Sequence, residues 1–382
     1  MSTEIKTLHA AGINAWDTYV SSHPDATLYH LSGWKNVIEK TYGHKTYYLI
    51  AQRPEPCAVS PSSGVQPTTH NERLAPAKPV GILPLVHLKH FLFGNNLISI
   101  PFFDYGGILA DDQETEIALL NEAIKLTKNI GAKSIELRQI NPINSLESQI
   151  QNSEFKIKNF NIVTHSHKVR MLIELPESSD ELMKSFKSKL RSQIRRPLKE
   201  GLTAAIGGVD LLDDFYRVFS INMRDLGSPV HSKRLIQNVL YEFSDKSRIV
   251  IIYKDELPMA CSMIISFKDT LENPWASSLR EFSRLAPNML LYWTMLRYAC
   301  DNGFNKFDFG RSTPGEGTYK FKEQWGARPE SLHWQYISVN GKPIDAATND
   351  KSIFVKAIQY WKKLPVPITM ILGPRIRNHI GL

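Results

Sequence analysis

Residues 307 to 329, FDFGRSTPGEGTYKFKEQWGARP, combine glycines, cations and aromatic rings within 23 positions. The glycines fit neither of two phosphate-binding fingerprints. In a P-loop a lysine and a hydroxyl residue follow the second glycine, but an acidic residue and a glycine follow Gly315 here. A dinucleotide-binding loop needs a third glycine where Lys320 stands. A turn explains the glycines, while the cations beside aromatic rings indicate a site for a phosphate or a sugar. The candidate binding residues in this stretch are Arg311, Tyr319 and Trp325.

A second basic stretch runs from residue 181 to residue 200. Apolar residues recur at every fourth position from Leu182 to Leu198, which predicts a helix with one apolar face. Pro197 is expected to kink or end this helix. Basic residues outnumber acidic ones by seven to two, and this excess fits either a solvated surface or contact with phosphates. Arg191 and Arg195 are the candidate phosphate contacts.

Few other residues form a recognisable catalytic pattern. His165 and His167 would share one face of a strand, but no acidic or cysteine ligand stands near them, so no metal site is predicted. The chain has neither GxSxG nor HExxH, which gives no local support for a serine hydrolase or a zinc protease. Asp308, in the strand-like FDFG, is a candidate catalytic base, and the alternative is a carboxylate that orients Arg311.

Composition restricts the class of protein. The 382 residues suffice for two domains, and 42% hydrophobic against 22% charged residues is typical of a soluble globular protein. A net charge of +8 favours an anionic partner, such as a sugar nucleotide, a lipid phosphate or an RNA. The three cysteines are scattered, so they predict neither a disulfide framework nor a zinc site and fit a reducing cytoplasm.

The two ends of the chain bear on localisation. The N-terminal residues lack the basic region and apolar core of a signal peptide, and no apolar run approaches the roughly 20 residues of a membrane-spanning helix. Near the C-terminus, LPVPITMILGP is short, broken by prolines and followed by arginines. We expect residues 364 to 382 to pack on the protein, with peripheral contact at the inner membrane face as the alternative. The predicted localisation is cytoplasmic.

The order of predicted elements repeats. Three strands, a helix and a fourth strand are predicted from residue 46 to residue 140, and the same order is predicted from residue 247 to residue 310. Helical segments precede both copies, at residues 12 to 42 and 180 to 244. Because independent errors rarely reproduce one order, the repetition indicates a duplicated α/β unit.

The repetition also suggests domain boundaries. We predict an N-terminal domain over residues 1–160, a C-terminal domain over 161–345 and a helical, amphipathic tail over 346–382. Residues 53–79 interrupt the first predicted hairpin and are rich in proline, serine and threonine, which predicts a mobile surface insertion.

Several segments together resemble the FemAB-related proteins of bacterial exosortase (PEP-CTERM) and exopolysaccharide systems. The resemblance is carried by SGWKNVIEKTYGHKTYYLIAQ, GILPLVHLKHFLFGNNLISIPFFDYGGILAD, KSKLRSQIRRPLKEG, APNMLLYWTMLRYACDNGFNKFDFGRS and GTYKFKEQWGARPESLHWQY, and it covers most of the chain apart from the insertion. It implies a fold of the α/β (α+β) class, with two tandem acetyltransferase-like (GNAT) domains. Each domain would be a mixed, mostly antiparallel sheet flanked by helices.

The resemblance also implies an activity. Fem proteins transfer an amino acid from aminoacyl-tRNA to a peptidoglycan precursor, and acetyltransferases among their relatives are thought to use acyl-CoA. In YKFKEQWG, Phe321 and Lys322 would lie in the active centre, with Lys322 stabilising the charge that develops during acyl transfer. Arg224 resembles an arginine that contacts the nucleotide-linked acceptor, and Asp111 falls near an aspartate once considered a base. Tyr105, in the matching FFDYGG segment, is a further candidate contact.

The sequence leaves the substrates open. The first-domain lysine of peptidoglycan-specific members is absent, with Ile38 near its place, and the expected glycine-rich CoA loop reads REFSRLAPNML. No tightly bound cofactor is predicted, and the donor is aminoacyl-tRNA or acyl-CoA. The predicted function is acyl or aminoacyl transfer to a nucleotide- or lipid-linked cell-envelope saccharide. A non-catalytic carbohydrate- or RNA-binding module and a membrane-peripheral scaffold of a polysaccharide synthase remain alternatives.

Overall fold

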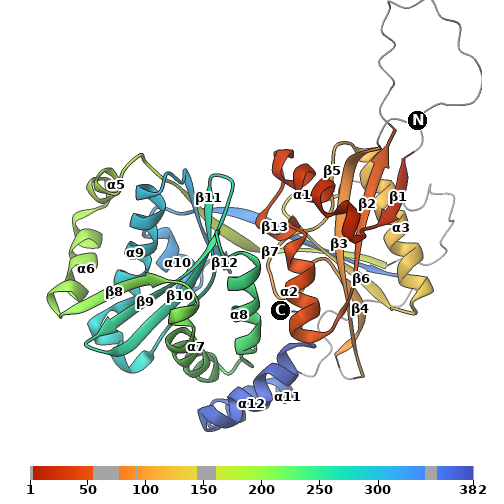
Figure 1. The fold of residues 1–382 in the computed structure, drawn as a ribbon. Helices are drawn as coiled ribbons and strands as arrows, with labels where there is room; N and C mark the ends of the chain where they lie inside the picture. Colours follow the sequence, from red (N-terminus) through yellow and green to blue (C-terminus); the bar gives the residue numbers. More distant parts are fainter. Residues whose placement is uncertain (1–2, 55–76, 92, 144–160, 340–350, 382) are drawn as a thin grey trace, which may run out of the picture.

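The computed structural model describes residues 3–54, 77–91, 93–143, 161–339 and 351–381 (Figure 1). Its first half alternates helices and strands in the predicted order. The elements are β1 (Glu4–Thr7), α1 (Ile13–Ser22), α2 (Gly33–Tyr42), β2 (Lys45–Arg53), β3 (Lys78–His90), β4 (Gly94–Ile98), β5 (Leu109–Ala110), α3 (Gln113–Asn129) and β6 (Ser134–Gln139). Within this half, β1, β2, β3 and β4 pair antiparallel in sequence, and β4 then pairs parallel with β6.

The second half repeats this arrangement. Its elements are β7 (Asn161–Glu174), α5 (Ser179–Ser185), α6 (Ser188–Lys199), β8 (Leu202–Gly207), α7 (Leu212–Leu226), α8 (Lys233–Glu242), β9 (Ser247–Lys254), β10 (Leu257–Phe267), β11 (Thr270–Ser278), α9 (Pro287–Asp301), β12 (Lys306–Ser312), α10 (Gly317–Glu323) and β13 (Arg328–Ser338). Strands β8 to β11 pair antiparallel in sequence, and β11 then pairs parallel with β12. The duplicated order predicted from the sequence is therefore confirmed.

The two halves share one sheet because each contributes a strand to the other. β7 follows β6 in the chain but pairs with β12, while β13 follows β12 in the chain and pairs with β6. β7 and β13 also pair with each other, so thirteen strands of the described residues form one continuous sheet. The fold is a mixed, mostly antiparallel sheet flanked by helices, as predicted. The boundary predicted at residue 160 falls among residues that the structure does not describe.

Apolar periodicity explains where the helices lie. α9 buries most of its length, including Leu290, Leu291 and Met295, because apolar residues surround it on nearly every side. Asp112 directly precedes α3, and its side chain accepts a hydrogen bond from the Thr115 N–H and so caps the helix. The helices α2 and α8 pack against each other across the two halves, and the ring of Trp34 contacts that of Phe243.

Four local predictions need correction. The basic stretch is not one helix bent at Pro197: the chain breaks between α5 and α6, around Phe186, and Pro197 lies inside α6. The segment predicted as helical before the second copy also contains strand β8, whose short run of small residues has weak periodicity. The loop after β12 continues into helix α10. Residue preferences at helix starts predict an N-cap at Asn288, but α9 begins at Pro287 and its N-cap is Ala286.

The C-terminal tail is helical, as far as the structure describes it. α11 (Lys351–Trp361) and α12 (Val366–Arg377) lie beside α7 at the lower edge of the molecule (Figure 1). The chain then runs back into the first half, where the Gly381 carbonyl accepts hydrogen bonds from the Phe102 N–H and from Arg138. None of the described helices is both long and apolar enough to cross a membrane. The predicted insertion lies mostly outside the described residues.

Candidate active site

Strands β11 and β12 separate at one point, and the separation creates an opening in the sheet. They pair only from Thr270 to Glu272 and from Lys306 to Asp308. Just beyond this point each strand carries an irregularity in its pairing with its other neighbour, β10 for β11 and β7 for β12. Bulges of this kind bend a strand away from its partner and are common beside active sites. In β12 the bulge includes Gly310, whose φ of 74° is a conformation that glycine adopts readily.

Lys322 projects from α10 to the β12 side of this opening. Its side chain is only 7% exposed, and its Nζ donates hydrogen bonds to the carbonyls of Gly310 at 3.0 Å and Arg311 at 2.8 Å. Burial lowers the pKa of Lys322 to about 8, although the nearby carboxylate of Asp308 opposes this shift. An ammonium group has three N–H donors, so two bonds to carbonyls leave one N–H for a ligand.

The opening forms a cavity of about 320 Å³ between the two halves, which we call the transfer cavity. β11 contributes Asn273 to Ala276, β12 contributes Phe309 to Arg311, and the first half contributes Tyr29 and Phe102 to Asp104. Arg377 of α12 also lines the cavity, so that three cations, Arg311, Lys322 and Arg377, face one carboxylate, Asp104. This charge balance favours an anionic ligand.

The two arginines are held differently. Arg311 Nη1 lies 3.3 Å from Asp104 Oδ1, an ion pair without the geometry of a hydrogen bond, and the guanidinium group stacks over the Trp334 ring. Arg377 donates from Nε to His231 Nε2 at 3.0 Å, and it has no carboxylate within 4.0 Å among the described residues. Burial, with a smaller contribution from Arg311 and Arg138, lowers the pKa of Arg377 to about 10, while Tyr42 and Asp104 oppose the shift. Both guanidinium groups therefore retain capacity to bind an anion.

Asp308 does not orient Arg311, contrary to the sequence-based alternative, because Asp104 takes that place. Asp308 is 1% exposed, and its Oδ1 accepts a hydrogen bond from the Gly310 N–H at 2.7 Å. Its Oδ2 lies 2.7 Å from the hydroxyl of Tyr105, which lies 3.0 Å from Oε2 of Glu272. The candidate base is thus part of a buried cluster with a second carboxyl group.

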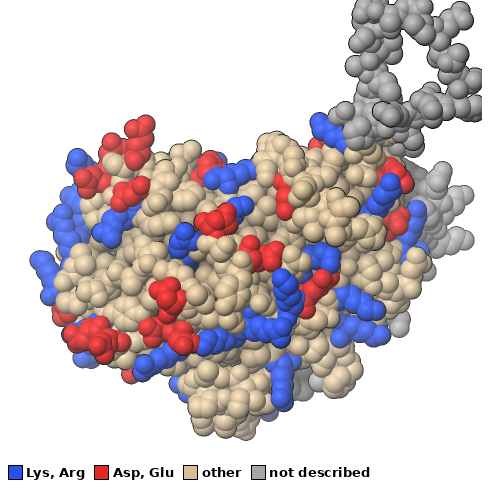
Figure 2. All heavy atoms as spheres, in the orientation of Figure 1, with Lys and Arg blue, Asp and Glu red and all other residues tan. Residues whose placement is uncertain are grey.

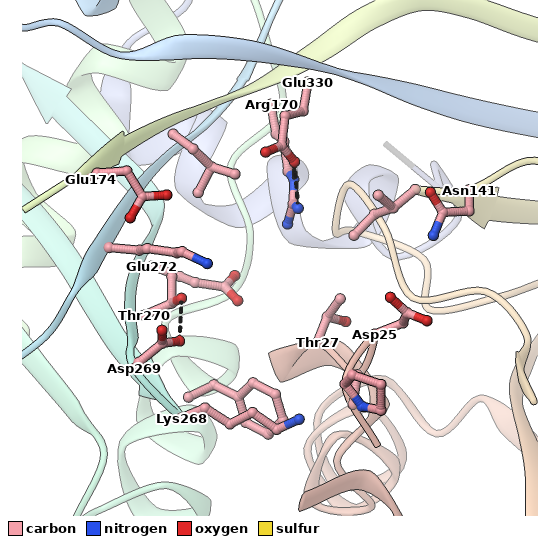
Figure 3. A pocket seen from close by; sticks show the side chains of 16 residues that line it. Asp25, Thr27, Asn141, Arg170, Glu174, Lys268, Asp269, Thr270, Glu272 and Glu330 are labelled. Carbon is pink, nitrogen blue, oxygen red and sulfur yellow. Dashed lines mark hydrogen bonds and ion pairs between the residues drawn. The ribbon is translucent and has the colours of Figure 1, made fainter. Parts of the chain in front are cut away.

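A second cavity, of about 220 Å³, lies on the other side of this cluster, and we call it the interdomain cavity (Figure 3). Glu272 borders it, together with Arg170, which pairs with Glu330 at 2.6 Å. The first half closes the cavity with residues 24–27, and Lys268 of the second half reaches this segment, where its Nζ donates to the His23 carbonyl. Lys306 also lines the cavity. The transfer cavity and the interdomain cavity therefore flank the last paired residues of β11 and β12.

Three further predicted site residues lie near α10. Phe321 packs on Tyr292 and Trp325 and is half-buried, so it supports the helix that carries Lys322. Trp325 is 1% exposed and belongs to the core of the second half, which leaves only its edge along a groove between α6 and α10. Tyr319 is half-buried against the same core.

The other predicted binding residues lie away from the transfer cavity. Arg224 pairs with Asp225 at 2.6 Å and donates to the Leu364 carbonyl at 3.1 Å, so it anchors the C-terminal tail. Asp111 is exposed in the first half, where it accepts a hydrogen bond from the Tyr19 hydroxyl. On α6, Arg195 is exposed, while Arg191 donates to the carbonyls of Lys184 and Phe186 and stabilises the break before that helix.

Sequence reasoning missed two residues at these cavities. Glu272 lies just before NPWASSLREF, the third strand predicted in the second copy, and its neighbours Leu271 and Asn273 give no pattern that marks it as a site residue. Arg377 lies 55 residues after Lys322 in a segment assigned to the tail, and no local pattern connects it to the site. Only the return of the chain to the first half places it there.

Comparisons with known proteins agree with this geometry. Residues 184–323, from the end of α5 to the end of α10, match the family model of the acetyltransferase (GNAT) domain. The crystal structure of FemX is similar, with a TM-score of 0.61 and 15% sequence identity over 86% of this chain and 96% of FemX. A tandem GNAT protein from the clavulanic acid biosynthesis pathway has a TM-score of 0.51 and 10% identity, over 90% of this chain and 100% of that protein. No curated protein matches. The fold is therefore that of two GNAT-like units in tandem, as the resemblance implied.

Proposed function

We propose that this protein is a GNAT-type acyltransferase or aminoacyltransferase that acts in the transfer cavity on a nucleotide- or lipid-linked cell-envelope saccharide. The acetyltransferase (GNAT) domain match ends one residue beyond Lys322 and includes both strands of the opening. The observation that carries the proposal is the buried Lys322 ammonium at that opening, with one N–H left for a ligand. The acceptor class includes exopolysaccharide and peptidoglycan precursors.

In the proposed reaction an acceptor amine or hydroxyl attacks the acyl carbonyl carbon of the donor. The new C–N or C–O bond forms as negative charge collects on the carbonyl oxygen. The carbonyl double bond then re-forms as the C–O bond of an aminoacyl ester or the C–S bond of a thioester breaks. The negative charge passes to the leaving group, which takes up the acceptor proton. Lys322 stabilises the oxyanion with its third N–H, in a site where low exposure strengthens the interaction. Arg311 and Arg377 bind a phosphate of the donor or the acceptor.

The donor is an acyl-CoA or an aminoacyl-tRNA, and surface charge beside the site supports a polyanion. Basic side chains gather along the edge where α6 lies (Figure 2). A groove of about 960 Å³ separates this helix from α10, and Lys187, Lys189 and Lys320 line it. At the start of α9, where a CoA-binding loop is expected, Ala286 has a φ of 55° and Pro287 follows. This turn offers fewer backbone N–H groups than a glycine-rich loop.

Contact with the inner membrane face through residues 364–382 is part of the proposal. Between residues 351 and 382 the chain has six basic residues and no acidic one. Ile368, Ile371 and Leu372 are exposed on one side of α12, where spacings of three and four residues place them together. An exposed apolar face with basic neighbours suits an anionic bilayer surface. Such contact would place a lipid-linked acceptor near the end of α12 that lines the transfer cavity.

The test is a transfer assay with labelled acetyl-CoA or with charged tRNA, each combined with a lipid-linked glycan extract. We expect Lys322→Ala to reduce donor-dependent labelling of the glycan by about 10²- to 10³-fold, the usual effect of removing one oxyanion contact. Lys128→Ala is the control because Lys128 is an exposed lysine on α3 that lines neither cavity nor the groove. Circular dichroism and thermal unfolding would check that both variants fold.

Two results would overturn the assignment. Full activity in Lys322→Ala would exclude this lysine from the reaction. Saturable binding of the glycan or of tRNA, without product from either donor, would instead indicate a non-catalytic binding module.

A further inference from the structure

Two phenylalanines, Phe91 and Phe93, lie in the turn that joins β3 to β4, and we call this segment the aromatic turn. The rings of both contact that of His90, with ring centroids 4.6 Å and 5.0 Å away. Phe91 is nevertheless 88% exposed, more than any other large apolar side chain of the described residues. A single exposed apolar residue is ordinary on a protein surface, so its surroundings determine what the exposure means.

Three exposed lysines lie at the same end of the sheet as the aromatic turn. Lys45 begins β2 and pairs in register with His87 of β3. Lys89 pairs with Asn95 of β4, whose carbonyl accepts a hydrogen bond from the Lys133 N–H at 2.7 Å. In the part of the chain that the structure describes, none of the three lysines has a carboxylate within 4.0 Å. Local ion pairs therefore do not neutralise this positive charge.

The C-terminal residues pack against the aromatic turn. The ring centroids of His90 and His379 lie 4.2 Å apart, and His44 Nε2 donates to the Asn378 carbonyl at 2.7 Å. The exposed Leu372 of α12 precedes His379 by seven positions, which is about 10 Å along a helix. Figure 1 shows α12 and the β3–β4 hairpin at the same lower edge of the molecule. The aromatic turn and the apolar side of α12 therefore lie at one edge of the protein.

The aromatic turn has the chemistry of a contact with an anionic bilayer. An inserted ring lies at the boundary between headgroups and acyl chains, and lysines beside it keep their ammonium groups at the lipid phosphates. Each lysine near such a surface strengthens binding about fivefold. A protein partner fits less well, because one exposed ring offers about 200 Å², whereas a stable protein interface needs about 800 Å² from each partner. Positive charge and a protruding ring thus favour lipid over protein.

We propose that the aromatic turn is a membrane contact, in which Phe91 enters an anionic bilayer while the three lysines face its phosphates. It is a second contact, on different residues from the α12 contact proposed above. One surface helix leaves a protein free to rotate about the helix axis, whereas two separated contacts fix its orientation. Since α12 ends at Arg377, which lines the transfer cavity, a fixed orientation holds that cavity at a constant distance from the lipid. This last consequence rests on the proposed function, and the membrane contact itself does not.

Sedimentation with vesicles of phosphatidylglycerol and phosphatidylcholine tests the contact. Phe91→Ser should weaken binding by about tenfold or more, because the burial of one phenylalanine in lipid is lost. Tyr241→Ser is the control, since Tyr241 is an exposed aromatic residue on α8, and it should leave binding unchanged. Thermal unfolding checks that both variants fold. Unchanged binding in Phe91→Ser, or equal weakening by both substitutions, would overturn the proposal.

Two lysines on one strand test the role of charge. Lys89→Ala should weaken binding to the same vesicles about fivefold. Lys78, also exposed, begins β3 at its other end, about 35 Å from Lys89 at the usual rise of a strand. That separation exceeds the screening length of about 8–10 Å at ordinary salt, so Lys78→Ala should have no effect. Equal effects of the two substitutions would mean that net charge, and not the aromatic turn, determines binding.

Fluorescence tests whether the turn enters the lipid. Phe91→Trp places an indole at the tip, and the wild-type protein gives the background of the native tryptophans. On binding to vesicles, the emission of Phe91→Trp should shift to shorter wavelength, and lipids brominated in their acyl chains should quench it more than they quench the wild type. Quenching no greater than that of the wild type would place residue 91 outside the acyl region and overturn the proposal.

A second copy of the chain is the alternative occupant of this surface. In sedimentation velocity without lipid, the wild-type protein and Phe91→Ser should have the same sedimentation coefficient. A wild-type dimer that Phe91→Ser dissociates would assign the aromatic turn to a protein interface and overturn the proposal. None of these measurements uses transfer, so the membrane contact can fail while Lys322→Ala still abolishes activity, and it can hold if the proposed function fails.

Discussion

Each half of this protein contains an opening beside a parallel pair of strands. Among the described residues, only the opening in the second half is a cavity lined with cations that keep unused hydrogen-bond donors. In the first half β4 and β6 pair parallel from Asn96 to Ile98, much as β11 and β12 pair in the second half. The chain's own end occupies the space beside that first pair: Gly381 lies against Ile98 and Arg138. In the second half the corresponding space is the transfer cavity. The corresponding space is thus filled by the chain itself in one copy and left as a cavity, the proposed site, in the other.

The buried cation beside each opening shows the same difference. Arg138 is 1% exposed; its Nε donates to Glu136 at 2.8 Å, Nη1 to the Phe103 carbonyl and Nη2 to the Gly381 carbonyl at 2.8 Å. Its hydrogen-bonding capacity is directed to the protein itself. Lys322 has two carbonyl partners and one remaining N–H. Each of the three guanidinium nitrogens of Arg138 therefore has a partner within the protein, whereas Lys322 keeps an N–H on its single nitrogen directed to a cavity.

The largest contrast is therefore expected between Arg138→Ala and Lys322→Ala. Arg138→Ala leaves Glu136 and two carbonyls without their donor, and we expect it to lower the free energy of unfolding by about 3 kcal/mol. Lys322→Ala also leaves two carbonyls without a donor, those of Gly310 and Arg311, but they border the transfer cavity, where water can replace Nζ. Because the substitution also removes a cation whose burial is unfavourable, we expect a change of at most about 1 kcal/mol alongside the loss of transfer. Urea unfolding of the two variants measures the difference. Equal destabilisation would break the distinction between the two openings.

The pH dependence of transfer sharpens the assignment of Lys322. With its pKa lowered to about 8, the ammonium form is present below that pH and is lost as the pH rises through it. A rate that depends on this charge should fall above about pH 8. Lys322→Arg should extend activity to higher pH, because a guanidinium group remains protonated. If the wild-type protein and Lys322→Arg lose activity at the same pH, a group other than Lys322 causes the fall of the rate at high pH.

Much of the framework could be predicted from the sequence because apolar periodicity and turns are local signals. The hairpin of β9 and β10, the helix ending at Asn129 and the repeated element order all have such signals. β8 was missed since Ala204 and Ala205 carry little periodicity, and the break at Phe186 was missed because Pro197 offered the stronger signal.

Residues of the candidate site could be predicted only where a sequence motif contained them. Lys322 came from the resemblance of YKFKEQWG, and Arg311 from its neighbourhood, and both line the transfer cavity. Arg224 and Trp325 have the residue types of binding sites, yet the first holds the tail and the second fills the core. Their roles depend on which distant segments of the chain pack against them. β13, α12 and the C-terminal residues all pack against segments that lie far from them in the sequence. Residue type and local spacing do not predict such long-range contacts.

Removal of residues 378–382 tests whether the chain's end fills the first opening. The Phe102 N–H and Arg138 would each lose the Gly381 carbonyl. A buried donor without its acceptor costs about 1–3 kcal/mol, and Arg138 retains other partners, so we expect a loss of about 2 kcal/mol. Thermal unfolding with and without these residues measures it. Arg377 remains in the truncated chain, so transfer activity should fall much less than in Lys322→Ala.

The smallest expected effect is on membrane binding, and it follows from a substitution on the outer side of the same C-terminal segment. Its inner side fills the first opening, while Ile371 on the outer side is 62% exposed, and the surface over α12 at the lower edge of Figure 2 is mostly uncharged. If that face contacts a bilayer, Ile371→Glu loses the burial of one isoleucine, about 1.5–3 kcal/mol, and adds repulsion from anionic lipid. Binding to vesicles of phosphatidylglycerol and phosphatidylcholine should weaken by about tenfold or more. Tyr241→Glu is the control, because Tyr241 is equally exposed at 61% but lies on α8. Equal weakening by both substitutions would mean that general surface charge, and not the α12 face, determines the binding. Unchanged binding in Ile371→Glu would leave the segment with its inner, structural role alone.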